Sequence, residues 1–420
     1  MDIISRTGML LSLLINCLKN KNRIILILLA VIILVWEGAA LSASISEIRK
    51  TFDDDFGRID PVSIKNHYKT IVENLSGIKI AGSVPIIYKP KGDVKNEWFS
   101  EEMESNRLNN DSKISGYEFL LKRLRLLPLD DSIKNILMTL YDDVYGLYDP
   151  SKKSIIFLEG TNRNLMPAIL FHELMHAAQD EAIDIEKYQE NYFTTLDSSL
   201  AASALLEGQA GALEYLVQME KNLEDNTRQE AIEEVIHFLD DKEGTLIEIG
   251  TYSPLKQVRA FPYTMGFSFV LKRIAKGEDF NEMFEKVPAT SEQVMHIDKF
   301  DSNEKPEKTI LEEKINQIKS LKNCSLLLHT TLGEYYILQI LNNSVDKNMA
   351  AGKRASEGWN GDSLAVIKNG KSFFLLWDTL WDTPKDAQEF YEEYIRYANK
   401  RFEKNEIIKD SHTFLLNRDG

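Results

Sequence analysis

Two histidines four positions apart, with a glutamate next to the first, constrain this chain more than any other feature. The segment Phe171–His176 reads FHELMH and so contains the pattern HExxH. On an α-helix, positions i and i+4 share a face, so His172 and His176 can bind one metal ion while Glu173 reaches a water on that ion. This set of ligands and base is typical of zinc hydrolases, and it works only if the segment is helical.

The residues around the motif predict such a helix. Asn164 or a neighbour can cap its start, Pro167 suits its first turn, and apolar residues pack around the histidines. These apolar residues are Ile169, Leu170, Leu174, Met175 and Ala178. Just before the helix, residues 154–159 form a β-branched and aromatic run between turn signals, which predicts a strand. That strand is either an edge strand that could hold an extended substrate backbone or an ordinary core strand.

A catalytic zinc ion needs a third protein ligand and an open position for water. We expect Glu207 to be that ligand, because it lies in segment 204–215, which is helical in pattern and rich in small residues. Such residues let two helices approach closely, as the meeting of Glu207 with the histidines requires. A solvated surface position is the alternative for Glu207, but an exposed carboxylate would not need Ala and Gly around it. Glu214, two turns further on the same face, is the alternative ligand or a partner of the ligands.

Spacing excludes the three-histidine variant of this motif. In the pattern HExxHxxGxxH the last two fixed positions would be 179 and 182, and this chain has Gln179 and Ala182 there. A site of two histidines and one glutamate is what remains. The other histidines without metal-ligand spacing are interpreted as ordinary surface or packed residues: His67, His237, His329 and His412.

The N-terminal region has the features of an export signal or a membrane anchor. Residues 24–36 form an uninterrupted apolar run. The basic residues before it are Lys19, Lys21 and Arg23. Such residues stay in the cytoplasm, so everything after the run is expected outside. Residues 1–45 are therefore predicted to be a signal peptide cleaved after Ser42 or an N-terminal membrane anchor, with a buried core helix as the alternative.

The length, charge and cysteine content of the chain limit the classes of protein to which it can belong. With 420 residues, the chain exceeds a single domain of about 150 residues. The formal net charge of -15 argues against electrostatic binding of nucleic acid. Its two cysteines, Cys17 and Cys324, are too few for a disulfide scaffold or a cysteine-rich zinc site. Nothing in the composition indicates an oligomeric state.

The pattern changes after the acidic, Lys-rich stretch 301–323. Beyond it, strands are predicted at 325–328, 363–368 and 372–378, and helices at 332–341 and 384–401. We therefore expect a small α+β lobe over residues 301–420, after a first globular domain at 46–300. In that first domain the expected elements include a strand at 83–88 and helices at 117–127 and 132–147.

Several segments together resemble a known family. Beside HELMHAAQD at 172–180, the chain has EGQA at 207–210, PYTMG at 262–266, SEQVMH at 291–296 and WNGD at 359–362. This order resembles a group of exported bacterial zinc metallopeptidases that carry HELxHAxQD, EGxA, PYxxG, a TEQxLH-type segment and GWxGD. The resemblance spans most of the chain after the apolar run, and HExxH and EGxA are its specific parts.

For this chain, the resemblance implies a gluzincin-like site in which Glu207 is the glutamate ligand. It also implies that the substrates are peptides or proteins. The chain departs from the group at Gln209, where an acidic residue is common. That departure leaves the ligand intact but can alter its support.

The chemistry requires two further kinds of residue. A tetrahedral oxyanion needs an extra hydrogen-bond donor, and His296 or Tyr263 could provide it. The alternatives are a structural histidine within a turn and a core tyrosine with a satisfied hydroxyl. A buried carboxylate should orient the metal-binding imidazoles, and the candidates are Asp180, Asp197 and Glu214.

The sequence thus predicts an α+β protein, with a zincin-like, mainly helical metallopeptidase domain, a short sheet beside the HExxH helix, and the C-terminal lobe. The expected activity is zinc-dependent hydrolysis of peptide bonds outside the cytoplasm, with Glu173 as general base and Zn²⁺ as cofactor. One alternative is an envelope protein that binds zinc through the same ligands without turnover. Glu173 argues against it, because a structural site needs no base and is usually closed by four ligands. The other alternative is a chance HExxH in an extracellular binding protein.

Overall fold

The computed structural model describes most of the chain after residue 60. The described residues are 61–94, 111–140, 144–161, 165–220, 228–241, 254–319, 324–343, 349–401, 407–409 and 414–416. They form helices and small sheets, so the expected α+β class is confirmed. The predicted signal or anchor, residues 1–45, lies outside these stretches. Within them, no helix has the length and apolarity to cross a membrane.

A three-stranded sheet lies beside the helix that carries HExxH. It consists of β1 (Ile86–Lys89), β2 (Gly146–Asp149) and β3 (Ser154–Leu158) in the order β1-β3-β2. β1 runs parallel to β3, and β2 runs antiparallel to it. All of β3 is buried. The predicted strand is thus confirmed as a core strand, and its interpretation as an edge strand is wrong because both of its edges are paired.

The helix predicted at 132–147 is too long. α7 (Ile133–Leu140) ends before Gly146, which begins β2. Gly146 lies where β2 crosses α8 (Met166–Ile183), and a Cβ atom at this position would lie 2.6 Å from Cγ2 of Ile169. This glycine therefore serves the close packing of a strand on a helix rather than the end of a helix.

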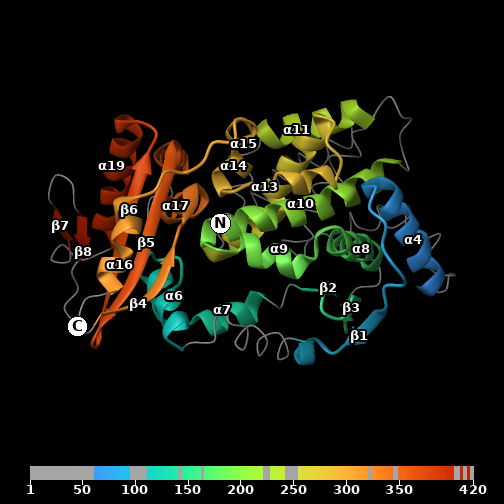
Figure 1. The fold of residues 1–420 in the computed structure, drawn as a ribbon, viewed down its shortest axis with the longest axis horizontal. Helices are drawn as coiled ribbons and strands as arrows, with labels where there is room; N and C mark the ends of the chain where they lie inside the picture. The colour runs from blue at the N-terminus through green and yellow to red at the C-terminus, as the bar shows by residue number, and fades with distance from the viewer. Residues whose placement is uncertain are drawn as a thin grey trace, which may run out of the picture.

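Three long helices form the centre of the fold (Figure 1). α8 carries HExxH, α10 (Leu196–Glu220) carries Glu207, and α10 contacts both α8 and α13 (Pro254–Ala275). A Cβ atom on Gly208 would lie 2.2 Å from the carbonyl oxygen of Gly266 in α13. The small residue next to Glu207 therefore permits backbone contact with α13. Small residues near Glu207 were expected to bring α10 close to the histidines of α8. For Gly208 this expectation is wrong, because Gly208 meets α13 instead.

The C-terminal part is a second sheet with helices packed against it. β4 (Cys324–Thr330), β5 (Trp359–Asn369) and β6 (Ser372–Trp381) are antiparallel in the order β4-β5-β6. α17 (Gly333–Asn342) contacts β5, and α19 (Pro384–Arg401) lies along β6 (Figure 1). The strands and helices predicted for this region are confirmed, with longer strands than expected.

Asp362 closes the junction between this sheet and α17. Its carboxylate accepts hydrogen bonds from the backbone N–H groups of Leu332 and Gly333, at the start of α17. It also accepts from the indole N–H groups of Trp359 and Trp377. Trp359 is fully buried, so it anchors the turn into β5 from beneath.

One apolar core joins the two parts of the chain. Buried side chains from Tyr68 of α4 (Pro61–Ser76) to Ala398 of α19 belong to one cluster. Both α10 and α13 contact α17. The boundary expected at residue 300 therefore does not separate two apolar cores, and the division into two domains stays a prediction.

The other described elements complete the fold. They are α6 (Asp111–Arg123), α9 (Ile185–Tyr192), α11 (Arg228–Asp241), η3 (Glu282–Glu285), α14 (Ser291–Met295), α15 (Ile297–Asp301), α16 (Ile310–Lys319), α18 (Met349–Ser356), β7 (Ile407–Lys409) and β8 (Phe414–Leu416). The helix predicted at 117–127 is α6, which begins earlier and ends at Arg123. The strand predicted at 83–88 is β1.

Candidate metal centre

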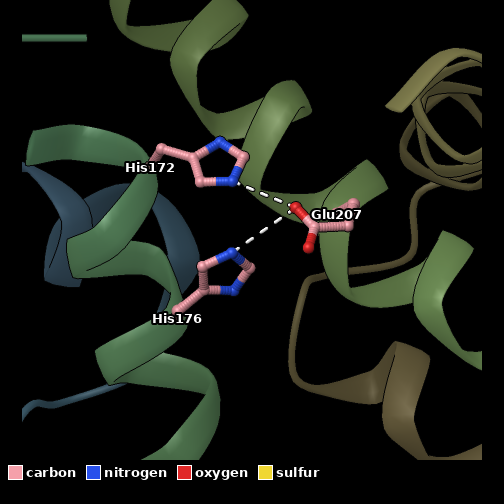
Figure 2. Close-up of side chains that lie close together, drawn as sticks. All are labelled: His172, His176 and Glu207. Carbon is pink, nitrogen blue, oxygen red and sulfur yellow. Dashed lines mark hydrogen bonds and ion pairs between the residues drawn. The ribbon is translucent and has the colours of Figure 1, made fainter. Parts of the chain in front are cut away.

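His172, His176 and Glu207 converge, and Figure 2 shows both imidazoles pointing from α8 toward the carboxylate on α10. Oε2 of Glu207 lies 3.0 Å from Nε2 of His172 and 3.5 Å from Nε2 of His176. A zinc ion with tetrahedral bonds of about 2.1 Å holds its ligand atoms about 3.4 Å apart. The structure thus brings together the three residues expected as ligands, with their ligand atoms within 4.8 Å of one another, close enough to hold one metal ion.

α8 positions the two histidines. Pro167 lies in its first turn, as expected, while Leu165 at the cap position makes no side-chain hydrogen bond and Asn164 lies outside the described residues. The imidazoles of His172 and His176 are 4.8 Å apart between ring centroids. Their side chains keep 17% and 14% of their surface exposed, so solvent reaches both rings.

Glu214 and Gln179 hold the outer nitrogens of the imidazoles. Nδ1 of His172 lies 2.7 Å from Oε1 of Glu214, and Nδ1 of His176 lies 2.8 Å from Oε1 of Gln179. An oxygen that accepts the Nδ1 proton leaves Nε2 to face Glu207. Glu214 is therefore placed as a partner of a ligand. Sequence reasoning missed Gln179, although its position one helical turn after His176 was a signal.

The other two carboxylates expected to orient the imidazoles have different partners. Asp180 accepts a hydrogen bond from the hydroxyl of Tyr148 at 2.8 Å and pairs with Lys153. Asp197 accepts from the backbone N–H of Ser291 at 2.9 Å. Asp180 thus ties β2 to α8, and Asp197 ties α14 to α10, so that expectation is wrong for both residues.

Glu173 is the buried carboxylate next to the first histidine. It is 6% exposed, and the backbone N–H of Tyr148 in β2 donates to it. Burial raises its pKa, and the charge of Glu207 acts in the same direction, against the two histidines. A carboxylate with a raised pKa accepts a proton more readily than an ordinary glutamate.

The electrostatics of the site suit a cation. Burial alone would lower the pKa of His172, but the carboxylates of Glu207 and Glu214 raise it well above its usual value. Burial alone would raise the pKa of Glu207, yet the charge of His176 and hydrogen bonds from both imidazoles lower it. Positive charge is therefore stabilised between these residues, and a divalent cation bound by the same atoms would be stabilised in the same way.

Tyr263 of α13 lies at the edge of the site. Its ring is stacked with that of His172 at 6.2 Å between centroids, and its hydroxyl lies near the carboxylate of Glu207. Burial of the hydroxyl and the charge of Glu207 raise the pKa of Tyr263, so the group stays a proton donor. The residue is 38% exposed, which leaves part of it accessible to a bound molecule.

His296 lies in a different environment, at the turn between α14 and α15. Its Nε2 is 3.0 Å from Oε2 of Glu334, a fully buried residue of α17. The structure thus gives His296 a partner on α17, and its role as an oxyanion donor stays a prediction.

A second group of carboxylates already contains its cation. Glu292, Glu304 and Asp382 lie close enough together to hold a metal ion. The ammonium of Lys299 lies among them, 2.6 Å from Glu292 and 2.9 Å from each of the other two. This cluster is therefore an internal ion-pair network that joins α14 and α15 to the end of β6.

The comparisons with known proteins concern the C-terminal part. A family model described as "Domain of unknown function (DUF8575)" matches residues 326–420. No curated protein and no solved structure matches the chain. The matched region begins within β4 and contains none of His172, His176 and Glu207, so it bears on the second sheet and not on the metal centre.

Proposed function

We propose that this protein is a zinc-dependent peptidase of the gluzincin type, with a zincin-like arrangement around its metal centre. The observation that carries the proposal is the convergence of His172, His176 and Glu207 beside the buried carboxylate of Glu173. Three protein ligands leave one coordination position open, as in catalytic zinc sites, whereas structural sites are closed by four. The order of motifs along the chain supports the same proposal.

The residues of the site have separate tasks in this chemistry. When bound, zinc would polarise a peptide carbonyl and make a water molecule more acidic. Glu173 would accept the proton of the attacking water and return it to the leaving amine. Tyr263 would donate a hydrogen bond to the developing oxyanion, since its hydroxyl lies beside Glu207 and stays protonated.

β2 is the strand that could hold an extended substrate. The N–H of Leu158 donates to the carbonyl of Tyr145, and in an antiparallel pair such bonded pairs recur at every second residue. With the register of β2 on β3, Leu147 and Asp149 then bond to β3. Gly146 and the carbonyl of Tyr148 therefore face the edge of β2 that carries no further described strand, while the N–H of Tyr148 at the same edge donates to Glu173.

That edge of β2 faces the catalytic carboxylate. The backbone N–H of Tyr148 reaches Glu173, so a peptide added to β2 as a further strand would pass beside the HExxH helix. Hydrogen bonding through the backbone would select extended peptides with little regard to side chains. We therefore propose that β2, and not the strand at residues 154–159, holds the substrate.

The setting of the activity follows from the N-terminal region. The apolar run and its basic flank support an exported protein that is either anchored in the membrane or released after cleavage. The proposed substrates are therefore peptides or proteins outside the cytoplasm.

The test compares the full-length protein with its Glu173→Gln variant. The matched control is Glu181→Gln, which changes an exposed carboxylate on the same helix. Zinc is measured by metal analysis of the purified proteins, and cleavage of a mixed peptide library is followed by mass spectrometry. We expect all three proteins to bind zinc and Glu173→Gln to cleave about 100- to 10,000-fold more slowly, because it lacks the general base.

Each other outcome has a clear meaning. Zinc without cleavage in the wild-type protein would favour the alternative of a zinc-binding envelope protein without turnover. Absence of zinc from the wild-type protein would reject both and leave HExxH as a chance sequence.

A further inference from the structure

We propose that Gln179 and Gln209 act together as positioning residues, which fix the ring nitrogen that His176 turns toward the metal. The inference rests on the proposed zinc site and goes beyond its ligands. Both glutamines are fully buried, although glutamine is rarely found without exposure in proteins. Their burial requires that every polar atom of the two amides has a partner.

A chain of hydrogen bonds runs from His176 to the backbone before η3. Nδ1 of His176 lies 2.8 Å from Oε1 of Gln179. Nε2 of Gln179 donates to the carbonyl oxygen of Leu206 at 2.9 Å and to Oε1 of Gln209 at 3.0 Å. Nε2 of Gln209 donates to the carbonyl oxygen of Phe280 at 2.7 Å.

The two backbone carbonyls set the direction of this chain. The carbonyl oxygens of Leu206 and Phe280 can only accept, so each must meet an amide N–H. Gln209 therefore turns Nε2 to Phe280 and Oε1 to Gln179. Gln179 must point its NH₂ group at both Leu206 and Gln209, which leaves Oε1 for His176. A flip of either amide would bring two acceptors together where no water can separate them.

The direction of these hydrogen bonds determines the tautomer of His176. Because Oε1 of Gln179 only accepts, Nδ1 of His176 must carry a proton. The lone pair of the neutral ring then lies on Nε2, the nitrogen 3.5 Å from Oε2 of Glu207. The opposite tautomer would place a proton where the metal ion binds.

The two histidines differ in the group that accepts the proton on Nδ1. His172 has a carboxylate on Nδ1, from Glu214, whereas His176 has an amide, from Gln179. A carboxylate accepts a proton whichever way it is turned, but an amide does so in only one of its two orientations. The amide therefore needs acceptors that fix its orientation, and these are the carbonyl of Leu206 and Oε1 of Gln209.

The experiment measures the zinc affinity of the full-length protein by competition with a chromophoric chelator. Gln179→Leu removes the acceptor, and we expect its zinc affinity to fall about 10- to 100-fold. Gln179→Glu keeps an acceptor for Nδ1 but loses both donated hydrogen bonds. We expect it to keep the wild-type zinc affinity, while its zinc-free form melts at a lower temperature.

The matched control is Gln339→Leu, which changes another buried glutamine, on α17, and should leave zinc affinity unchanged. A merely structural role for Gln179 predicts that both variants at this position lose zinc affinity in step with stability. That result, or an unchanged affinity in Gln179→Leu, overturns the inference while the zinc site stands. If the wild-type protein itself binds no zinc, the proposed function fails and the inference fails with it.

A second measurement needs no variant at Gln179 and so does not depend on how that variant folds. Histidine nitrogens are labelled with ¹⁵N in the zinc-loaded wild-type protein and assigned by single substitution of the other histidines. For His176 we expect metal-bound Nε2 and a slowly exchanging proton on Nδ1. Metal bound through Nδ1 would overturn the inference.

Discussion

Two carboxylates of this protein, Glu207 and Asp362, each face several nitrogen atoms, yet their surroundings are opposite. Glu207 faces the Nε2 atoms of two histidines, and 22% of its side chain is exposed. Asp362 is 5% exposed and accepts hydrogen bonds from two backbone and two indole N–H groups. Indole and backbone donors keep their protons, whereas imidazoles can release theirs to bind a metal. The kind of donor and the access of solvent therefore distinguish a carboxylate that could bind a metal ion from one that stabilises the fold.

The largest expected effect concerns Glu207, the more exposed of the two carboxylates. Glu207→Ala removes a ligand and should abolish both zinc binding and turnover. In thermal unfolding, zinc at 100 times its dissociation constant should stabilise the wild-type protein by about 2.7 kcal/mol relative to the chelated form, and the variant not at all. Zinc bound with wild-type affinity by the variant would contradict this assignment and point to Glu214 as the ligand.

Asp362→Ala tests the role of the buried carboxylate. It would leave the N–H groups at the start of α17 and two indoles without an acceptor, so we expect a loss of about 4 kcal/mol in the free energy of unfolding. Urea unfolding of the zinc-free protein measures this loss. Zinc affinity, measured by chelator competition at low temperature, should stay at the wild-type value. A variant that loses zinc but not stability would erase the distinction between the two carboxylates.

Tyr263→Phe sharpens the comparison within the metal centre. The change removes only a hydroxyl that faces Glu207, so we expect about a 100-fold lower turnover with unchanged zinc content. Tyr192→Phe is the matched control, because Tyr192 has the same exposed fraction, 38%, and lies on α9. Equal turnover in the two variants would reject Tyr263 as the oxyanion donor.

The smallest expected effect concerns His296, which the structure places against Glu334. His296→Phe should leave turnover and zinc affinity unchanged and lower the free energy of unfolding by about 2 kcal/mol, because it removes the hydrogen bond to a buried carboxylate. Peptide cleavage and urea unfolding of the same preparation measure both. A fall in turnover at unchanged stability and zinc content would restore the oxyanion role expected from the sequence.

The sequence predicted best what depends on neighbouring residues. The HExxH helix and the strand before it follow from local periodicity, and both form where expected. Glu207 was chosen as the third ligand on the pattern of its own helix, and it does face the histidines. The reason given for the choice was wrong, since Gly208 faces α13 and an amino-acid pattern does not say which neighbour a small residue meets.

Long-range pairings were beyond local patterns. β3 could be predicted as a strand but not as the central one, because its partner β1 lies far back along the chain. The same limit hid the partner of His296, which comes from α17, and that of Gln209, which is a backbone carbonyl at Phe280. Backbone groups are identical in every residue, so no sequence signal marks which carbonyl a side chain will meet.

The close contact between Gly208 and Gly266 fixes the position of α10 against α13, and with it the position of Glu207. A Cβ atom at Gly208 would lie 2.2 Å from a carbonyl oxygen of α13, so any larger residue must push the two helices apart. Glu207 is the adjacent residue and would move with α10, whereas metal sites accept errors of only about 0.2 Å in ligand distance. The packing of these two glycines thus fixes where α10 holds Glu207. A larger residue at Gly208 would therefore displace Glu207 relative to the two histidines without changing any of the three candidate ligands.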